Sequence, residues 1–134
     1  MTGVVVDSSA IVAIVTHETG WEQLTSELWS ADDRLVSAAT LAESGIVMEN
    51  RFTLHGLEAV ERLIREARLS VVSVDRDDAE AAVGAWRRFG RARHQAQLNY
   101  GDCFTYALAE RTGYPILCVG NDFAKTDLEV VPAR

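Results

Sequence analysis

The sequence lacks the short motifs that mark two large classes of enzyme. It contains no His-Glu-x-x-His motif and no glycine-rich phosphate-binding loop, and its three histidines are scattered at positions 17, 55 and 94. These absences argue against a zinc hydrolase and against a P-loop enzyme. Cysteine is also scarce. Cys103 and Cys118 lie in apolar stretches without metal-site spacing, so we expect two buried, reduced thiols rather than a disulfide.

Linker-like and membrane-spanning segments are missing as well. Proline is rare, and we find no Gly/Ser-rich stretch and no internal repeat. The 134 residues, of which 48% are apolar and 25% charged, predict a single soluble domain over residues 1–134. The apolar segment 3–15 is too short to span a bilayer, contains Asp7 and follows no basic residue. We therefore expect no membrane partner and a cytoplasmic protein.

Positive charge is in short supply. The net charge is −7, and Lys125 is the only lysine. This balance argues against a protein that wraps nucleic acid through general electrostatics, but not against a nuclease, because metal-binding carboxylates are themselves acidic. Four arginines crowd together at Arg87, Arg88, Arg91 and Arg93. They form either a solvated helix end or a phosphate-contact patch, and Arg87, Arg91 and Arg93 are the candidate RNA contacts.

The hydrophobic pattern alternates between strands and helices. Strands are predicted at 4–6, 34–37, 69–74 and 116–119, with a candidate fifth at 130–131. Helices are predicted at 10–15, capped by Ser8 and Ser9, and at 18–29, 40–52, 57–67, 76–89 and 101–112. This alternation predicts an α/β fold with a parallel sheet and helices on both faces, whose ligands bind at the carboxyl ends of the strands.

Four acidic residues fall near those strand ends. Asp7 ends the first strand, Glu43 lies in the first turn of the helix after the second, Asp102 begins a later helix, and Asp122 follows the fourth strand. Because the carboxyl ends of parallel strands share one edge, the acids beside them should lie together there, and the helix of Asp102 can reach the same edge.

Each acid also has a purely structural explanation as a helix cap. Glu43 can form a capping box with Thr40, and Asp102 lies three residues after Asn99. The other two acids can be N-caps. A capping acid normally stays at the surface, however, whereas Glu43 has apolar helical neighbours.

A cluster of carboxylates on one edge is electrostatically unfavourable unless some are protonated or a cation is bound. All-oxygen ligands favour Mg²⁺ or Mn²⁺ over zinc. Such an ion can activate a water and stabilise a phosphodiester under in-line attack. We therefore interpret the four acids as candidate ligands of a catalytic metal.

Four segments carry a family resemblance: "VVVDSSAIVAIV", "LAESGIV", "NYGDCFTYALA" and "GNDFAKTD". In this order they resemble the acidic motifs of PIN-domain ribonucleases, in particular the VapC toxins of type II toxin–antitoxin systems. The resemblance covers nearly the whole chain. It implies a three-layer α/β/α sandwich with a central parallel sheet. It also implies Mg²⁺- or Mn²⁺-dependent endonucleolytic cleavage of RNA.

The resemblance also implies roles for individual residues. Asp7 and Asp102 would be the principal metal ligands, while Glu43 and Asp122 would complete the site and orient the attacking water. Supporting hydrogen bonds would come from Ser8 or Ser9. The fourth motif departs from the Thr-x-Asp of many relatives, since this chain has Gly-Asn-Asp at 120–122. Asp127 could therefore share or replace the role of Asp122.

The resemblance implies partners too. Such toxins inhibit translation by cutting tRNA or rRNA, form homodimers, and are silenced by a cognate VapB antitoxin that covers the active-site groove. The aromatic residues Trp21, Trp86 and Tyr100 are either base-stacking groups or core or interface residues, and we expect the latter.

Three rival interpretations remain open. A receiver domain also places acids at strand ends, but it needs a pair of acids after its first strand, where this chain has Ser8 and Ser9. A PIN-like module that binds RNA or protein without cutting it would not need all four acids. A DNA-directed nuclease is the third rival, because no residue here can be identified as a reader of the 2′-hydroxyl.

Overall fold

The computed structural model describes residues 2–132 and contains one five-stranded sheet in the order β3-β2-β1-β4-β5, in which every neighbouring pair is parallel. The strands are β1 (Gly3–Val6), β2 (Asp33–Ser37), β3 (Ser70–Val72), β4 (Ile116–Leu117) and β5 (Val130–Val131). The α-helices are α1 (Ser8–Thr16), α2 (Trp21–Ser30), α3 (Ala38–Phe52), α4 (Leu54–Glu66), α5 (Arg76–Phe89) and α6 (Tyr100–Thr112). A short 3₁₀ helix, η1 (Phe123–Lys125), follows β4.

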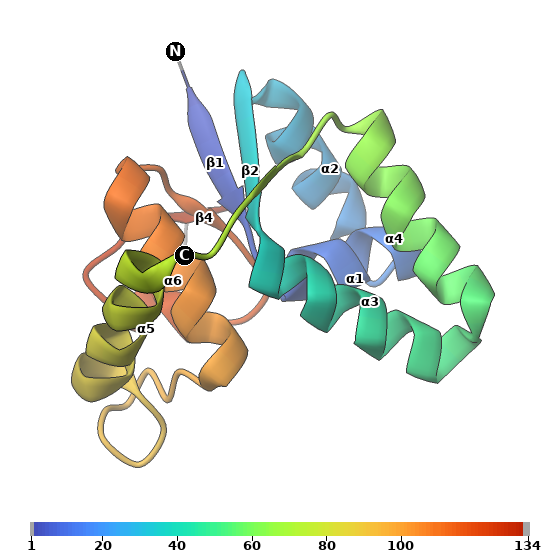
Figure 1. Ribbon diagram of the computed structural model, residues 1–134. Helices are drawn as coiled ribbons and strands as arrows, with labels where there is room; N and C mark the ends of the chain where they lie inside the picture. Colours follow the sequence, from blue (N-terminus) through green and yellow to red (C-terminus); the bar gives the residue numbers. More distant parts are fainter. Residues whose placement is uncertain (1, 133–134) are drawn as a thin grey trace.

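Helices cover both faces of the sheet, as the alternating pattern predicted. Figure 1 shows α1 to α4 on one side and α5 and α6 on the other. The central strand β1 contributes to both cores: Val4 and Val6 pack in the cluster with α1 to α4, and Val5 packs in the cluster with α5 and α6. This alternation follows from the two-residue period of a strand. The predicted three-layer α/β/α sandwich is thus confirmed.

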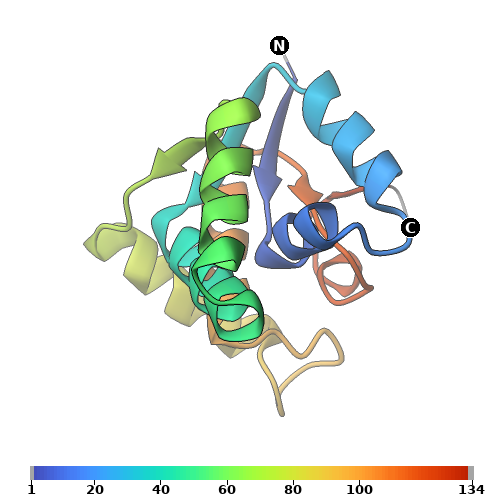
Figure 2. The same ribbon diagram turned by 90° about the vertical axis from the view of Figure 1, so that its right-hand side faces the viewer.

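The first four helices form one continuous layer. Figure 2 views the molecule from this side, where α3 and α4 form a helical hairpin next to α1 and α2. None of the helices in residues 2–132 is long and apolar enough to cross a membrane. Both cysteine thiols are buried and no disulfide joins them, as predicted.

The start of α3 differs from the prediction. The N-cap is Ser37, the last residue of β2, whose hydroxyl accepts a hydrogen bond from the Ala39 amide at 3.2 Å. The capping box between Thr40 and Glu43 is therefore wrong, because the strand already supplies the capping oxygen and the chain enters the helix without a loop. As a result Glu43 lies in the second helical turn, directed into the structure rather than at the helix entrance.

Candidate active site

Asp7 is the most buried acid of the carboxyl edge, with 2% of its surface exposed. It is the N-cap of α1, so Ser8 and Ser9 are the first helical residues rather than the caps. Its Oδ2 accepts hydrogen bonds from the Ser9 amide (3.1 Å) and the Ser9 hydroxyl (2.7 Å). Its Oδ1 accepts one from the Thr105 hydroxyl (2.8 Å), which in turn is 3.1 Å from the Thr40 hydroxyl. Asp7 is therefore fixed in orientation from α1, α3 and α6 at once.

Ser9 joins two strand ends of this edge. Its hydroxyl donates to Asp7 and accepts a hydrogen bond from the Val119 amide at 3.0 Å, just after β4. One side chain thus ties the end of β1 to the end of β4. This is the kind of supporting role that the sequence predicted for Ser8 or Ser9.

Glu43 is held in the same region without a full set of hydrogen bonds. Its Oε1 is buried and has no hydrogen-bond partner within residues 2–132. Burial raises the pKa of the Glu43 carboxyl, a hydrogen bond from Ser8 opposes the shift, and the charge of Asp7 adds to it. The carboxylate lies against Gly101, where a Cβ atom would come within 2.4 Å of Oε2. The absence of a side chain at Gly101 therefore makes the space that Glu43 occupies.

Asp102 begins α6 in a capping box with Asn99, as its position three residues later predicted. The Asn99 amide donates to Asp102 Oδ2 (3.0 Å), and the Asp102 amide donates to Asn99 Oδ1 (2.9 Å). Burial raises the pKa of the Asp102 carboxyl to about 7 despite the Asn99 hydrogen bond, with further contributions from the charges of Asp7, Glu43 and Asp122. The four predicted acids are therefore electrostatically coupled at one edge of the sheet.

The two candidates for the fourth acid lie in different surroundings. Asp122 is exposed at the start of η1, makes no capping hydrogen bond there, and acts on Asp102 through its charge. Asp127 instead accepts hydrogen bonds from the Tyr106 hydroxyl and from Arg88, which hold the pKa of its carboxyl below the ordinary value. Because Asp127 is already paired with the Arg88 guanidinium, and because Asp122 but not Asp127 is among the charges that act on Asp102, the geometry favours Asp122.

The donor chemistry of this edge fits a hard divalent cation. All the candidate ligands are carboxylate oxygens, the type that Mg²⁺ and Mn²⁺ prefer. The unpartnered Glu43 Oε1 and the raised pKa of Asp102 both indicate missing positive charge. As they stand, however, no three His, Cys, Asp or Glu side chains in residues 2–132 form a group that could hold a metal ion. The acids would have to close around the ion.

Three residues that support this edge did not emerge from the sequence. Thr105 and Thr40 carry the hydrogen bonds that reach Asp7, and Gly101 makes room for Glu43. The available signal was composition: two threonines and a glycine occur inside the apolar helices that carry the acids. Polar hydroxyls at fully buried positions usually satisfy a specific partner.

The arginine group divides in two. Arg88 is paired with Asp127 (3.0 Å) and Glu110 (3.6 Å), so it belongs to the fold. Arg87, Arg91 and Arg93 are exposed and form no ion pair within residues 2–132, and the Arg93 guanidinium lies 4.3 Å from the centre of the Trp86 ring. These three are the ones predicted to contact RNA.

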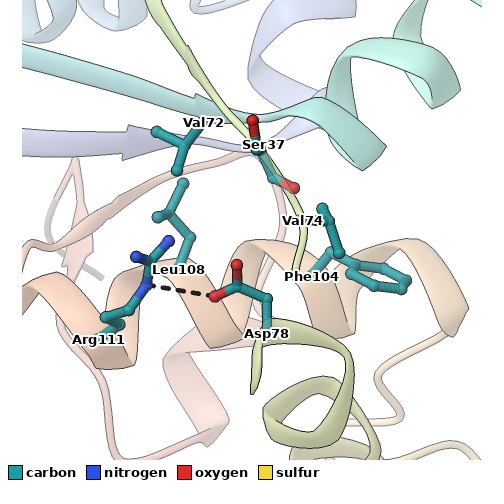
Figure 3. Close-up of a pocket in the computed structure, with 8 residues that line it drawn as sticks. Ser37, Val72, Val74, Asp78, Phe104, Leu108 and Arg111 are labelled. Atoms are coloured by element: carbon teal, nitrogen blue, oxygen red, sulfur yellow. Dashed lines mark ion pairs between the residues drawn. The ribbon is translucent and has the colours of Figure 1, made fainter. Parts of the chain in front are cut away.

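A second capping box begins α5 on the same side of the sheet. The Asp75 amide donates to Asp78 Oδ2 (3.1 Å), and the Asp78 amide donates to Asp75 Oδ1 (2.9 Å). Figure 3 shows Asp78 facing Arg111 of α6, whose Nε lies 3.2 Å from Asp78 Oδ1. This acid has a cation beside it, and the small hollow around it, about 10 Å³, leaves no room for a substrate.

Comparison with known proteins agrees with this class of fold. The family profile of the PIN domain matches residues 4–129. "Ribonuclease VapC" of Mycolicibacterium smegmatis is 43% identical over 127 residues, which cover 95% of this chain and 98% of the relative. "Ribonuclease VapC36" of Mycobacterium tuberculosis is 44% identical over 126 residues, covering 93% of this chain and 91% of that protein. The chain therefore belongs to the VapC ribonucleases of the PIN-domain family.

Solved structures share the fold at low sequence identity. The crystal structure of Mycobacterium tuberculosis VapC20, described as a "Sarcin-Ricin loop cleaving toxin", has a TM-score of 0.78 at 17% identity and covers 96% of this chain and 98% of that one. VapBC2 from Rickettsia felis has a TM-score of 0.73 at 11% identity, covering 96% of this chain and 97% of that one.

Proposed function

We propose that this chain is a Mg²⁺- or Mn²⁺-dependent endoribonuclease and the toxin of a toxin–antitoxin pair. The observation that carries the proposal is the set of acids at the carboxyl edge, which forms no ion pair within residues 2–132 and includes a buried carboxylate oxygen without a hydrogen-bond partner there. Membership in the VapC ribonucleases supports RNA as the substrate.

In this mechanism Asp7 and Asp102 would hold the metal. Asp7 is pre-oriented by Ser9 and Thr105, while Asp102 keeps Oδ2 in the capping box and has Oδ1 free of hydrogen bonds within residues 2–132. A bound Mg²⁺ or Mn²⁺ supplies a water of lowered pKa and neutralises charge on the phosphodiester.

The remaining acids position the attacking water. Glu43 Oε1 would accept a hydrogen bond from the attacking water, since this oxygen has no partner in residues 2–132. Asp122, exposed at the rim, completes the acidic set from the end of β4. Arg87, Arg91 and Arg93 contact the phosphates of the RNA outside the acidic centre, where they offset its repulsion of the substrate.

The partners follow from the family. We propose that the target is tRNA or rRNA, so that cleavage inhibits translation, and that the chain forms a homodimer silenced by a cognate VapB-type antitoxin. Neighbours of the fold include a toxin–antitoxin complex from Klebsiella pneumoniae and VapBC from Salmonella typhimurium. Addition of the antitoxin is expected to abolish cleavage, and sedimentation equilibrium of the purified chain measures the dimer.

The test uses purified protein free of antitoxin and total bacterial RNA. Discrete fragments are expected with Mg²⁺ or Mn²⁺ and none with EDTA, and their ends identify the target. The control is Asp7→Asn, which keeps the shape of the capping side chain. Cleavage that persists in EDTA or in Asp7→Asn contradicts the proposed site. A folded wild-type protein that cuts no RNA under any condition would instead be a binding module.

A further inference from the structure

An apolar hollow of about 560 Å³ lies between α5 and α6, outside the acidic centre. Its walls are formed mainly by Ala82, Val83 and Trp86 of α5 and by Tyr100, Cys103 and Phe104 of α6. Asn99 also lines the hollow and forms the capping box with Asp102, so the hollow adjoins the residue at which cleavage is proposed.

Two aromatic side chains flank the hollow and are held in place. Tyr100 is 81% exposed, and its ring meets Phe104 edge-to-face with the ring centres 5.0 Å apart. Trp86 is 43% exposed, so neither side chain is a core residue, and of the two roles expected from the sequence only the interface role is left. The Trp86 ring packs against Gly90, where a Cβ atom would lie only 2.3 Å from Trp86 Cδ1, and the Arg93 guanidinium covers it. Large exposed rings fixed in this way can stack a base at little entropic cost.

The loop between α5 and α6 presents positive charge at the rim. An isolated bridge between Gly90 and Leu98 closes it, with the Arg91 amide donating to the Leu98 carbonyl at 2.9 Å. Ala92 and Gln97 adopt left-handed backbone conformations (φ 66° and 51°), which non-glycine residues rarely take without a structural reason. In this loop conformation Arg91 lines the hollow.

We propose that this hollow seats an unpaired base of the RNA substrate beside the cleaved bond, stacked on Trp86 and Tyr100, with Arg91 and Arg93 contacting the flanking phosphates. This inference rests on the proposed function. The occupant is indicated by charge complementarity: in a chain of net charge −7, an apolar hollow of the size that holds a small ligand is bordered by arginines without ion pairs in residues 2–132. An apolar protein segment would not require these cations, whereas a nucleotide needs both the apolar wall and the positive rim.

Binding of short RNA by the cleavage-deficient Asp102→Asn protein tests the proposal. The probes are a fluorescein-labelled 12-nucleotide oligoadenylate and a strand of the same length and charge with abasic riboses, followed by fluorescence anisotropy. Trp86→Leu is expected to weaken oligoadenylate binding about tenfold, the loss of one stacked base, and to leave abasic-strand binding unchanged. Trp86→Phe, which keeps a stacking ring, should retain most of the affinity.

The molecule provides a matched control. Trp29 is 48% exposed and carries the Arg34 guanidinium over its ring at 5.0 Å, but it lies at the end of α2 beside the start of β2, at the opposite edge of the sheet. Trp29→Leu should change binding less than twofold. Circular dichroism melting of each variant confirms that it is folded.

Several outcomes overturn the inference. Equal losses of oligoadenylate affinity in Trp86→Leu and Trp29→Leu would show that no base binds in the hollow. Equal wild-type affinity for the abasic strand and oligoadenylate would show the same. Unchanged RNA binding with lost self-association in Trp86→Leu would assign the hollow to a second copy of the chain. If the wild type cleaves RNA in a metal-dependent manner but gives any of these results, the proposed function stands and only the base-binding role of the hollow is wrong. If binding depends on Trp86 and on the bases but no cleavage occurs, the hollow binds a base and the proposed nuclease activity is wrong.

Discussion

Helices α5 and α6 begin with the same hydrogen-bonded motif in different electrostatic surroundings. In α5 the Asp75 amide bonds to Asp78 Oδ2 at 3.1 Å, and in α6 the Asn99 amide bonds to Asp102 Oδ2 at 3.0 Å. The return bonds are both 2.9 Å. The third-position aspartate thus has the same local role in both helices.

The difference lies in the second carboxylate oxygen. Asp78 Oδ1 faces the Arg111 guanidinium (Figure 3), whereas burial and the charges of Asp7, Glu43 and Asp122 disfavour ionisation of Asp102. A cap explains the first aspartate completely, because its charge is balanced inside the fold. It leaves the second unexplained, because three further acids destabilise its ionised form. One side chain can therefore both cap a helix and bind a ligand. The residues that pack around it from other elements decide whether it has the ligand-binding role.

The largest difference between the two boxes is expected in catalysis. Asp102→Asn keeps an oxygen for the Asn99 amide but removes the charge, so cleavage should fall at least about 100-fold, as expected for the loss of a group at a metal site. Asp78→Asn makes the same change in the other box and should stay within a factor of about three of the wild type. Initial rates on a fluorescent RNA with saturating Mg²⁺ measure both. A fully active, folded Asp102→Asn protein would remove this residue from the site.

The same pair of substitutions should change stability in opposite directions. Asp78→Asn loses the ion pair with Arg111, whose side chain is half exposed, and is expected to destabilise the protein by up to about 1 kcal/mol. Asp102→Asn removes repulsion among the acids and should stabilise the metal-free protein by about 1 kcal/mol or more. Urea unfolding in EDTA measures both values. Changes of equal sign would mean that the boxes differ less in their surroundings than the structure indicates.

Much of the fold was predictable from the sequence because its signals are local. Alternating apolar strands and helices fixed the parallel sheet, and the parallel strand ends brought Asp7 and Asp122 to one edge with the helices of Glu43 and Asp102. The N-cap of α3 at Ser37 was not predicted because Thr40 and Glu43 also have the spacing of a capping box. The choice between these two sites depends on where β2 ends, which packing determines.

The contacts that distinguish the two aspartates could not be predicted in this way. Both lie three residues after a side chain that caps a helix, so the sequence near each is equivalent. Arg111 reaches Asp78 from another helix, and Thr105 reaches Asp7 across 98 positions of sequence. Such pairings are set by how α5 and α6 pack on the sheet, and a single sequence carries no direct record of them.

The pH dependence of stability should also separate the two boxes. The folded-state pKa of Asp102, about 7, is above its ordinary value of 3.8, so the folded metal-free protein binds more protons than the unfolded one between these values. Its free energy of unfolding should therefore fall as pH rises from 3.8 toward about 7 and stay low above that. Asp102→Asn should flatten this fall, and Asp78→Asn should not. Thermal melting in EDTA at pH 5 and pH 8 gives the comparison, and identical pH profiles of wild type and Asp102→Asn would contradict it.

A smaller effect is expected from the glycine that borders the acidic edge. In Gly101→Ala the new methyl group would displace the Glu43 carboxylate, the flexible end of a side chain, so cleavage should fall about tenfold with little loss of stability. Gly84→Ala is the matched change in α5, where a Cβ meets nothing within 4 Å. It should raise stability by about 0.5–1 kcal/mol and leave cleavage unchanged. Equal activity of the two variants would mean that the position of Glu43 is not critical.

The smallest expected effect concerns the positive rim of the hollow between α5 and α6, where the expected partner is a phosphate rather than a metal. Arg91→Gln removes one candidate phosphate contact, so the slope of log affinity against log salt for RNA binding should decrease by about one. Arg62→Gln removes an equally exposed arginine from α4 and should leave the slope unchanged. Anisotropy titrations of the Asp102→Asn protein between about 50 and 200 mM salt measure this slope. Equal slopes in the two variants would show that Arg91, like Arg62, interacts with solvent and not with a phosphate. The negative charge of the acids around Asp102 would then have to be neutralised by the metal alone.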